Sequence, residues 1–339
     1  MCTAISFKTN HHYFGRTLDL EYSYEEQVVI TPRNYAFQFR NEQGYSSHYA
    51  IIGMAYVQNN YPLYYDATNE MGLSVAGLNF PGNAMFYPPK EGVHNIAAFE
   101  LIPWILGVCK SAREAKQLLE KTNITDVDFS LALTAAPLHW MISDREQSIV
   151  VESTKAGLQI YDNPIGVLTN NPPFDYQMSN LSNYVNLTAG VPTNRFLEEF
   201  FMQTASNRLD SKALYSKDLY SKGLGAFGLP GDWSSASRFV RAAFVKVNSV
   251  CGSSPEESIS QFFHILDVVG EPEGCVRLEE GKCHMTVYTS WCDTALGVYY
   301  YTTYGTRQIS AVDMRKEALD SCELICFPLI KEQQIKRQN

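Results

Sequence analysis

The stretch Met1–Asp19, MCTAISFKTNHHYFGRTLD, decides how the rest of this sequence is interpreted. Its second residue is Cys2, so removal of Met1 would place a thiol and a free α-amine on one residue. Such an amine titrates near pH ~8 and can accept the thiol proton, which gives the nucleophile its own base. Arg16 and Asp19 are the first candidates to stabilise a thiolate and to hold the amine.

A simpler interpretation of Cys2 stays open at this point. Any residue can follow an initiator methionine, and a buried cysteine in a first strand is usually a small hydrophobic residue. Arg16 and Asp19 could form an ordinary ion pair in a hairpin. They also lie three positions apart, which places them on opposite faces of a regular strand. Strand periodicity alone therefore does not bring both side chains to Cys2.

Composition indicates a folded protein without a nucleic-acid partner. The chain has 339 residues, of which 45% are hydrophobic and 13% aromatic, and its net charge is −9. Charged residues between Lys8 and Asp19 interrupt any signal peptide. The most apolar window, Ile96–Cys109, is too short to span a membrane and contains Glu100. We therefore expect a cytoplasmic protein with no membrane partner.

The cysteines and histidines do not predict a metal site. The eight cysteines show no paired CxxC spacing, and the seven histidines do not complete a zinc pattern. His11 and His12 are adjacent, so they would point to opposite faces of a strand. We expect free thiols, no metal and no cofactor.

Local patterns predict strands and helices in alternating blocks. The predicted strands are Thr3–Lys8, Tyr13–Leu20, Gln27–Thr31, Ala50–Tyr56, Tyr61–Tyr65, Gly72–Asn79, Leu138–Ser143, Ser148–Ser153, Leu158–Tyr161, Gly166–Thr169, Met285–Trp291, Ala295–Tyr304 and Gln308–Met314. The predicted helices are Asn95–Cys109, Ser111–Thr122 (opened by a Ser111–Glu114 capping box), Phe196–Thr204, Ser234–Ser249 and Pro255–Val269. This order indicates an α+β fold, and two sheets between helix layers is one packing that fits it.

Several stretches, in order, resemble the choloylglycine hydrolases, the family of conjugated bile salt hydrolases and penicillin V acylases. They are Met1–Thr3, Phe14–Asp19, Gly77–Asn83, Val167–Pro172, Leu229–Asp232, Ser237–Phe239 and Tyr299–Tyr301. Each stretch is weak alone, and together they are specific. The resemblance implies one N-terminal-nucleophile hydrolase domain over residues 1–339, with a four-layer αββα fold and the nucleophile at a strand start.

The resemblance also implies roles for residues of the first stretch. Cys2 would be the nucleophile, and its α-amine would act first as base and then as acid. Asp19 would hold the amine, and Arg16 would contact the thiolate and lower its pKa.

The remaining polar roles fall on residues far along the chain. Asn79, through its backbone N–H, and Asn170, through its side-chain amide, would form the oxyanion hole. Asn171 is the alternative to Asn170, although asparagines before prolines are commonly turn formers. Arg238 would complete the cluster. It shares a predicted helix with Arg241, a pattern that a plain surface helix also shows.

The substrate prediction rests on Asn79 and on apolar residues. In this family, asparagine within Gly-Leu-Asn-Phe-Pro-Gly resembles the bile salt hydrolases, whereas penicillin V acylases more often carry tyrosine there. An amphipathic steroid needs an apolar wall, because buried apolar surface contributes about 25 cal/mol per Å². The candidate wall residues are Leu18, Tyr22, Tyr24, Tyr56, Tyr65, Leu133 and Ala136. Ordinary core packing is the alternative.

Three functions remain open. The first is a bile salt hydrolase that cleaves the steroid amide of glycine or taurine through a thioester, with acyl transfer to another amine as a side activity. The second keeps the chemistry with penicillin V or another N-acyl compound. The third is a non-catalytic protein that binds steroid-like amphiphiles. The resemblance also implies a homo-oligomer, specifically a tetramer. The segment around residues 191–222 is longer than the family pattern, and we interpret it as an insertion in the region that commonly mediates assembly.

Overall fold

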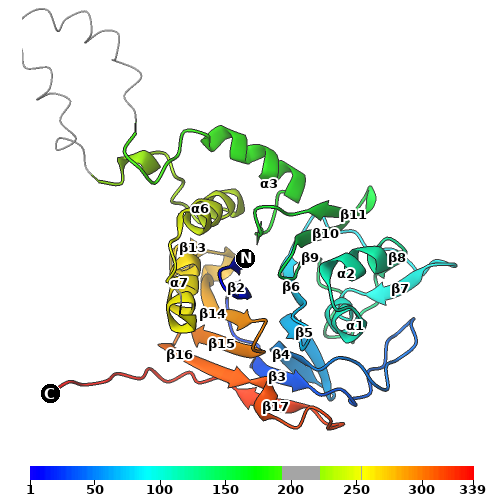
Figure 1. The fold of residues 1–339 in the computed structure, drawn as a ribbon. Coiled ribbons are helices and arrows are strands. Elements are labelled where there is room, and N and C mark those ends of the chain that lie inside the picture. Colours follow the sequence, from blue (N-terminus) through cyan, green and yellow to red (C-terminus); the bar gives the residue numbers. More distant parts are fainter. Residues whose placement is uncertain (193–221, 253) are drawn as a thin grey trace, which may run out of the picture.

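The computed structural model describes residues 1–192, 222–252 and 254–339, and two antiparallel sheets form its centre (Figure 1). The first sheet has seven strands, in the order β12-β1-β2-β14-β15-β16 with β13 also paired to β14. The second has eight strands, in the order β11-β10-β9-β6-β5-β4-β3-β17. The first stretch of the chain therefore lies inside one sheet rather than at an edge.

The strand bounds follow the sheets. The first sheet contains β1 (Cys2–Lys8), β2 (His12–Leu20), β12 (Val167–Leu168), β13 (Val276–Arg277), β14 (Cys283–Asp293), β15 (Val298–Thr303) and β16 (Thr306–Asp313). The second contains β3 (Gln27–Thr31), β4 (Ile51–Gln58), β5 (Tyr61–Asn69), β6 (Ser74–Asn79), β9 (Leu138–Ser143), β10 (Ser148–Thr154), β11 (Gly157–Asp162) and β17 (Ile325–Pro328). A separate parallel pair is formed by β7 (His94–Ala97) and β8 (Thr122–Thr125).

Helices cover the outer face of each sheet. Helices α6 (Ser235–Asn248) and α7 (Pro255–Asp267) pack on β1, β12 and β14, while α1 (Leu101–Val108) and α2 (Ala112–Leu119) pack on the second sheet (Figure 1). A further helix is α3 (Phe174–Asn180), and short 3-10 turns are Leu181–Tyr184, Leu224–Ala226, Glu279–Gly281 and Met314–Lys316. The predicted α+β class and the four-layer αββα arrangement are confirmed.

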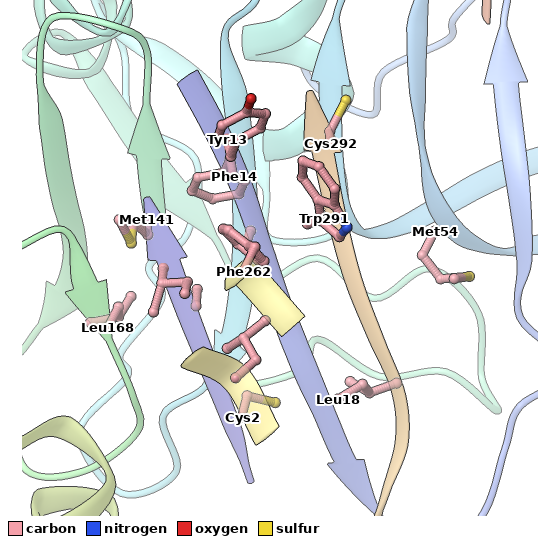
Figure 2. Packing of buried hydrophobic residues seen from close by; sticks show 14 of the residues in the cluster. Cys2, Tyr13, Phe14, Leu18, Met54, Met141, Leu168, Phe262, Trp291 and Cys292 are labelled. Atoms are coloured by element: carbon pink, nitrogen blue, oxygen red, sulfur yellow. The ribbon is translucent and has the colours of Figure 1, made fainter. Parts of the chain in front are cut away.

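Apolar side chains fill the space between the sheets. Leu18 of the first sheet and Met54 and Met141 of the second belong to one buried cluster, shown in Figure 2. Cys2 belongs to the same cluster and is only 3% exposed. A second cluster lies between the second sheet and helices α1 and α2. The N-terminal end of β1 therefore lies at this main core cluster.

The pairing of β2 with β14 depends on a glycine. Gly15 lies opposite Trp291, and a Cβ at Gly15 would meet the carbonyl oxygen of Ser290 at 2.0 Å. The Trp291 ring stacks on Tyr300 at 4.6 Å and on Phe262 of α7 at 5.3 Å. Gly15 therefore lets β2 and β14 approach closely, and the Trp291 ring on β14 packs α7 against the sheet.

The prediction of one helix over Asn95–Cys109 is wrong in its first part. The structure forms β7 there, and α1 begins only at Leu101. The backbone N–H of Asn95 donates to Oε1 of Glu42 at 2.7 Å, and the strand pairs with β8. These distant partners outweigh the local helical spacing of apolar residues.

The predicted capping box is half present. Ser111 Oγ accepts from the N–H of Glu114 at 3.2 Å, but Glu114 Oε2 accepts from the N–H of Lys110 at 2.8 Å instead of Ser111. Helix α2 then ends at Leu119, before the predicted Thr122, because β8 begins there.

Other elements were missed or lie elsewhere. Strands β8 and β17 and helix α3 were not predicted, since each is short and is defined by partners distant in sequence. The predicted helix Phe196–Thr204 and almost all of the 191–222 insertion lie outside the described residues. Within the described ranges, no helix combines the length and apolarity that crossing a membrane requires.

Truncation of Trp291 tests the aromatic layer. Trp291 is fully buried, so Trp291→Ala is expected to lower the free energy of unfolding by about 3–5 kcal/mol. Val247→Ala, at an exposed position of α6, is the control and should change it by less than about 0.5 kcal/mol. Urea unfolding followed by tryptophan fluorescence and far-UV circular dichroism measures both. Equal effects of the two variants would contradict the packing described.

Candidate active site

Cys2 begins β1 where the two sheets face each other, at the N-terminus marked in Figure 1. Its backbone N–H donates to Oδ1 of Asn170 at 2.8 Å. Met1 extends the β1–β2 ladder, because the N–H of Asp19 donates to the carbonyl oxygen of Met1 at 2.9 Å. Loss of Met1 would leave the Cys2 nitrogen, now an amine, beside Asn170.

Asn170 is fixed on three sides. Its backbone N–H donates to Oγ of Ser235 at 2.8 Å, and its Oδ1 accepts from Nη2 of Arg238 at 2.7 Å. Because a guanidinium only donates, this contact defines which amide atom is oxygen. Nδ2 then points to the second sheet and donates to the carbonyl oxygen of Asn79 at 2.7 Å. The second N–H of Nδ2 has no acceptor among the residues that the structure describes.

Arg238 is fully buried near the start of α6 and ties the helix to the N-terminus. Nη1 donates to the carbonyl oxygen of Cys2 at 2.5 Å and to Oγ1 of Thr3 at 2.7 Å. Nε donates to the carbonyl oxygen of Trp233 at 3.0 Å. Arg238 therefore contacts both the backbone of Cys2 and the side chain of Asn170, which sets their relative position.

Asn79 ends β6 with its peptide groups turned away from β9. The N–H of Phe80 donates to the carbonyl oxygen of Pro137 at 2.7 Å, so Phe80 occupies a hydrogen-bonded position of the antiparallel ladder. The alternation then gives Asn79 a non-hydrogen-bonded position. Its N–H and C=O point to the same free side, where the amide of Asn170 lies. The backbone N–H of Asn79 and the side-chain N–H of Asn170 thus converge at the end of β6.

Arg16 points into the space between the sheets on the same face as Cys2. Nη1 donates to the carbonyl oxygens of Tyr65 at 3.1 Å and Gly77 at 2.5 Å. Nη2 is buried without a hydrogen-bond partner in the part of the chain that the structure describes. Burial alone would lower the pKa of Arg16, but nearby Cys2 and Asp66, together with Tyr288 and Asp19, outweigh it and raise that pKa. The guanidinium stays charged beside the thiol.

Asp19 is buried on the opposite face of β2 from Arg16. Its carboxylate accepts from Oγ1 of Thr286 at 2.7 Å and from Oγ1 of Thr17 at 3.0 Å. Thr17 Oγ1 in turn accepts from the N–H of Thr3 at 3.2 Å. The β-bulge of this region lies in β14, opposite Asp19, and not in β2. Asp19 therefore reaches the start of β1 through Thr17.

Glu271 is a further carboxylate, close to Arg238 and His284. Its side chain is fully buried, lies 3.7 Å from Nε of Arg238 and 3.8 Å from Nδ1 of His284, and has no hydrogen-bond partner among described residues. Burial, and next the charge of Asp19, raise the pKa of Glu271 to about 7, although Arg238 and the N-terminal amine act to lower it.

The candidate wall residues Leu18, Tyr22 and Tyr24 lie at or just beyond the end of β2 that pairs with Cys2. Leu18 is buried directly opposite Cys2 in the β1–β2 ladder. Tyr22 and Tyr24 are exposed and share a hydroxyl hydrogen bond of 3.0 Å, and the Tyr24 ring lies 6.4 Å from Tyr56. Tyr65 is half-buried next to Arg16, whose Nη1 bonds its carbonyl oxygen.

Two further candidate wall residues lie in the loop before β9. Leu133 is half-buried and Ala136 is exposed. Ala136 immediately precedes Pro137, whose carbonyl oxygen accepts from Phe80. The loop thus emerges beside the end of β6.

The structure separates the alternative residues from the cluster. Asn171 Nδ2 donates to the carbonyl oxygen of Pro81 at 2.7 Å, and its Oδ1 accepts from Asn83 at 2.9 Å, so it serves the neighbouring loop. Arg241 is buried and bonds the carbonyl oxygens of Pro230 and Val268 at 2.8 and 2.7 Å.

Sequence reasoning missed Glu271 and Asp66. Glu271 follows α7 in a Glu-Pro-Glu turn, and Asp66 sits in β5, where it accepts hydroxyl hydrogen bonds from Tyr288, Ser290 and Tyr299. Neither acid belongs to a periodic pattern of residues. An isolated charge within an otherwise apolar strand was the one available sign for Asp66.

Comparison with known proteins agrees with this geometry. Residues 2–327 match the linear amide C–N hydrolases, choloylglycine hydrolase family. The chain belongs to this family. The predicted enzyme class, an amidase of the choloylglycine hydrolase type, is thereby confirmed.

Relatives of this family match along the whole chain. A bile salt hydrolase/transferase of Lactiplantibacillus plantarum is 49% identical over 334 residues, with 98% of each chain covered. A crystal structure of a variant of the conjugated bile acid hydrolase from Clostridium perfringens has a TM-score of 0.87 at 37% identity and covers 100% of both chains. Penicillin V acylase from Agrobacterium tumefaciens has a TM-score of 0.70 at 20% identity, with 96% of this chain and 90% of that chain covered. That last likeness concerns the fold alone.

The raised pKa of Glu271 predicts a pH dependence of stability. The folded state holds this proton up to about pH 7, whereas an unfolded glutamate loses it near pH 4.5. Between these values the folded state binds more protons, so the free energy of unfolding falls as pH rises. Glu271→Gln should flatten this fall in urea unfolding measured at about pH 5 and about pH 7.5. Glu273→Gln, two residues away and exposed, should keep the parent slope, and an unchanged slope in Glu271→Gln would contradict the assignment.

Proposed function

We propose that this choloylglycine hydrolase cleaves conjugated bile salts, releasing glycine or taurine, with Cys2 as nucleophile after removal of Met1. One observation carries the proposal. The Cys2 nitrogen lies 2.8 Å from Oδ1 of Asn170, and Nδ2 of the same amide bonds Asn79 at 2.7 Å. The nitrogen proposed as base and the two residues proposed as oxyanion donors therefore belong to one hydrogen-bonded chain. The bile salt hydrolase/transferase at 49% identity supports the substrate class.

Acylation follows from this arrangement. The free amine of Cys2 accepts the thiol proton, and Sγ attacks the amide carbonyl carbon. The remaining N–H of Asn170 and the N–H of Asn79 stabilise the resulting oxyanion. The ammonium then returns the proton to the amide nitrogen, the C–N bond breaks, and glycine or taurine leaves as a free amine. The steroid acyl group stays on Sγ as a thioester.

Deacylation uses the same groups in reverse. The amine accepts a proton from water, whose oxygen attacks the thioester carbonyl. The C–S bond breaks, and the departing thiolate takes the proton from the ammonium to form the thiol again. An amine that replaces this water would receive the acyl group instead, which is the acyl-transfer side activity. Both outcomes share one intermediate.

Arg16 fits the role of thiolate partner. It points to the same face as Cys2. Its buried Nη2 has no hydrogen-bond partner among the described residues and would leave an N–H unsatisfied unless an acceptor lies beside it. A Cys2 thiolate would satisfy that group. Asp19 would act on the amine through Thr17 and the start of β1, since its carboxylate bonds hydroxyl groups.

The apolar residues at the end of β2 and in the loop before β9 suit a steroid substrate. Leu18 lies opposite Cys2, and the exposed rings of Tyr22 and Tyr24 continue outward from the end of β2. Leu131, in the loop before β9, is fully exposed and faces no core residue. Burial of such surface against a steroid stabilises the complex. Penicillin V remains the alternative substrate, and the non-catalytic function is disfavoured by membership of a hydrolase family.

The Cys2→Ala variant tests the nucleophile and the substrate together. Release of glycine from glycocholate and of taurine from taurocholate should fall by at least about 10⁴-fold, because the thiol is the attacking group. Penicillin V is assayed in parallel, and intact-mass spectrometry of the parent establishes that Met1 is absent. Turnover of penicillin V alone would move the substrate to the acylase branch. Full bile-salt turnover by Cys2→Ala would overturn the mechanism.

Paired asparagine variants test the oxyanion donor. Asn170→Ala should lower kcat about 10²–10³-fold, because it removes a donor aimed at the developing charge. Asn171→Ala, one residue later, is the matched control and should stay within about threefold of the parent, since its side chain bonds the Pro81 loop. Steady-state glycocholate hydrolysis measures both. A larger loss in Asn171→Ala than in Asn170→Ala would exchange their roles.

A further inference from the structure

A buried pair, His139 and Glu152, lies between the two sheets and has no role in the chemistry above. Both side chains are fully buried, and Nδ1 of His139 lies 3.0 Å from Oε1 of Glu152. His139 lies opposite Leu78 in the β6–β9 ladder, and Leu78 belongs to the inter-sheet cluster. Side chains opposite one another share a face, so His139 points toward the first sheet. Burying two such polar groups is costly unless each finds partners.

His139 reaches across to the first sheet. Its Nε2 lies 2.8 Å from the carbonyl oxygen of Thr169, which immediately follows β12. A carbonyl oxygen only accepts, so Nε2 carries the hydrogen and donates it. The next residue after Thr169 is Asn170, the proposed side-chain donor of the oxyanion hole. His139 therefore holds the backbone directly beside that donor.

The same ring also contacts the other donor strand. The His139 ring stacks on Phe80 with centroids 4.2 Å apart and planes inclined by 6°. Phe80 is fully buried and immediately follows Asn79, whose N–H is the proposed backbone donor. The His139 imidazole thus contacts Thr169, the residue before Asn170, and Phe80, the residue after Asn79.

Glu152 holds the imidazole in place. Its Oε1 bonds Nδ1 of His139 and accepts from the N–H of Phe174 at 3.1 Å. Phe174 begins α3 and packs against Phe239 of α6, the helix that carries Arg238. With Nε2 committed to Thr169, a single proton shared between Nδ1 and Oε1 satisfies the contact. The pair is therefore anchored to the second sheet and to the α3 region at once.

We propose that His139, oriented by Glu152, is a positioning residue that fixes the distance between the two halves of the oxyanion hole. This inference rests on the proposed function, because it assumes that Asn79 and Asn170 stabilise the oxyanion. One proposed donor, Asn79, ends β6 of the second sheet, and the other, Asn170, lies two residues beyond β12 of the first. Oxyanion donors act only within about 2.7–3.1 Å of the charge. Apolar packing between sheets does not fix their relative sliding to that precision, whereas a directional hydrogen bond does.

Two substitutions separate positioning from stability. His139→Gln places an amide N–H near the position of Nε2 and keeps a donor for Thr169, but loses the ring and the contact with Glu152. His139→Asn places its amide near Nδ1 and cannot reach Thr169. His139→Asn should lower kcat for glycocholate at least tenfold with KM within about twofold, because the lost alignment matters in the transition state. His139→Gln should recover most of this loss.

His12 supplies a matched control. It is also a buried histidine between the sheets, with Nε2 3.1 Å from Oγ of Ser143 and Nδ1 3.0 Å from Oγ1 of Thr294. Ser143 lies four residues beyond His139 on β9, about 13 Å farther from the hole. His12→Asn should lower the thermal midpoint as His139→Asn does, but keep kcat within about twofold of the parent.

Glu152→Gln covers the case in which His139→Asn does not fold. Its amide oxygen would accept from Phe174, which leaves Nδ1 of His139 without a proton to share. A loss of kcat of at least fivefold at unchanged KM is expected in the folded fraction.

The proposal is overturned if His139→Asn, or Glu152→Gln in its place, keeps the parent kcat. It is equally overturned if the loss of kcat in His139→Asn and His139→Gln is proportional to the fall in the thermal midpoint of each variant. Failure of the proposed function looks different, because the parent itself would then release no glycine from glycocholate. A wrong oxyanion assignment would instead show as full turnover by Asn170→Ala. All variants are measured as the full chain with Met1 removal verified by mass.

Discussion

The hydrogen bond between the Cys2 nitrogen and Oδ1 of Asn170 is the contact on which the site depends. It joins the first strand to a residue 168 positions away, and Arg238 fixes the same oxygen from α6 at 2.7 Å. Because Oδ1 is committed to these donors, Nδ2 must face the second sheet and the end of β6. One amide orientation therefore links the nitrogen of Cys2, the proposed base, to Asn79, the proposed second oxyanion donor.

Polar contacts between the sheets give this site its geometry, while apolar packing supplies most of the stability. Arg16 crosses from the first sheet to carbonyl oxygens of the second, Asp66 crosses in the other direction to hydroxyl groups, and His139 bonds Thr169. Asp66 is buried, and this burial raises its pKa. Buried polar groups that lose a partner are costly, so these contacts restrict the sheets to one relative position.

The sequence was sufficient where local patterns carry the information. The hairpin of β9 and β10 follows from strand alternation, and the α7 helix follows from helical spacing of apolar residues. Motifs also brought Cys2, Asn170 and Arg238 to attention before their contacts were visible. The Asn95–Cys109 helix failed because Glu42 and β8, both distant in sequence, capture Asn95. Glu271 and His139 were missed for the same reason, since their environment is formed entirely by distant residues.

The central claim is that the acyl group is carried on Cys2 of a chain that has lost Met1. Acid quenching during glycocholate turnover, followed by intact-mass and peptide mass spectrometry, tests it most directly. The account predicts a population whose mass exceeds that of the chain without Met1 by one cholyl group, located on the peptide that begins with Cys2. A cholyl group on another residue, or turnover by a chain that retains Met1, would contradict it.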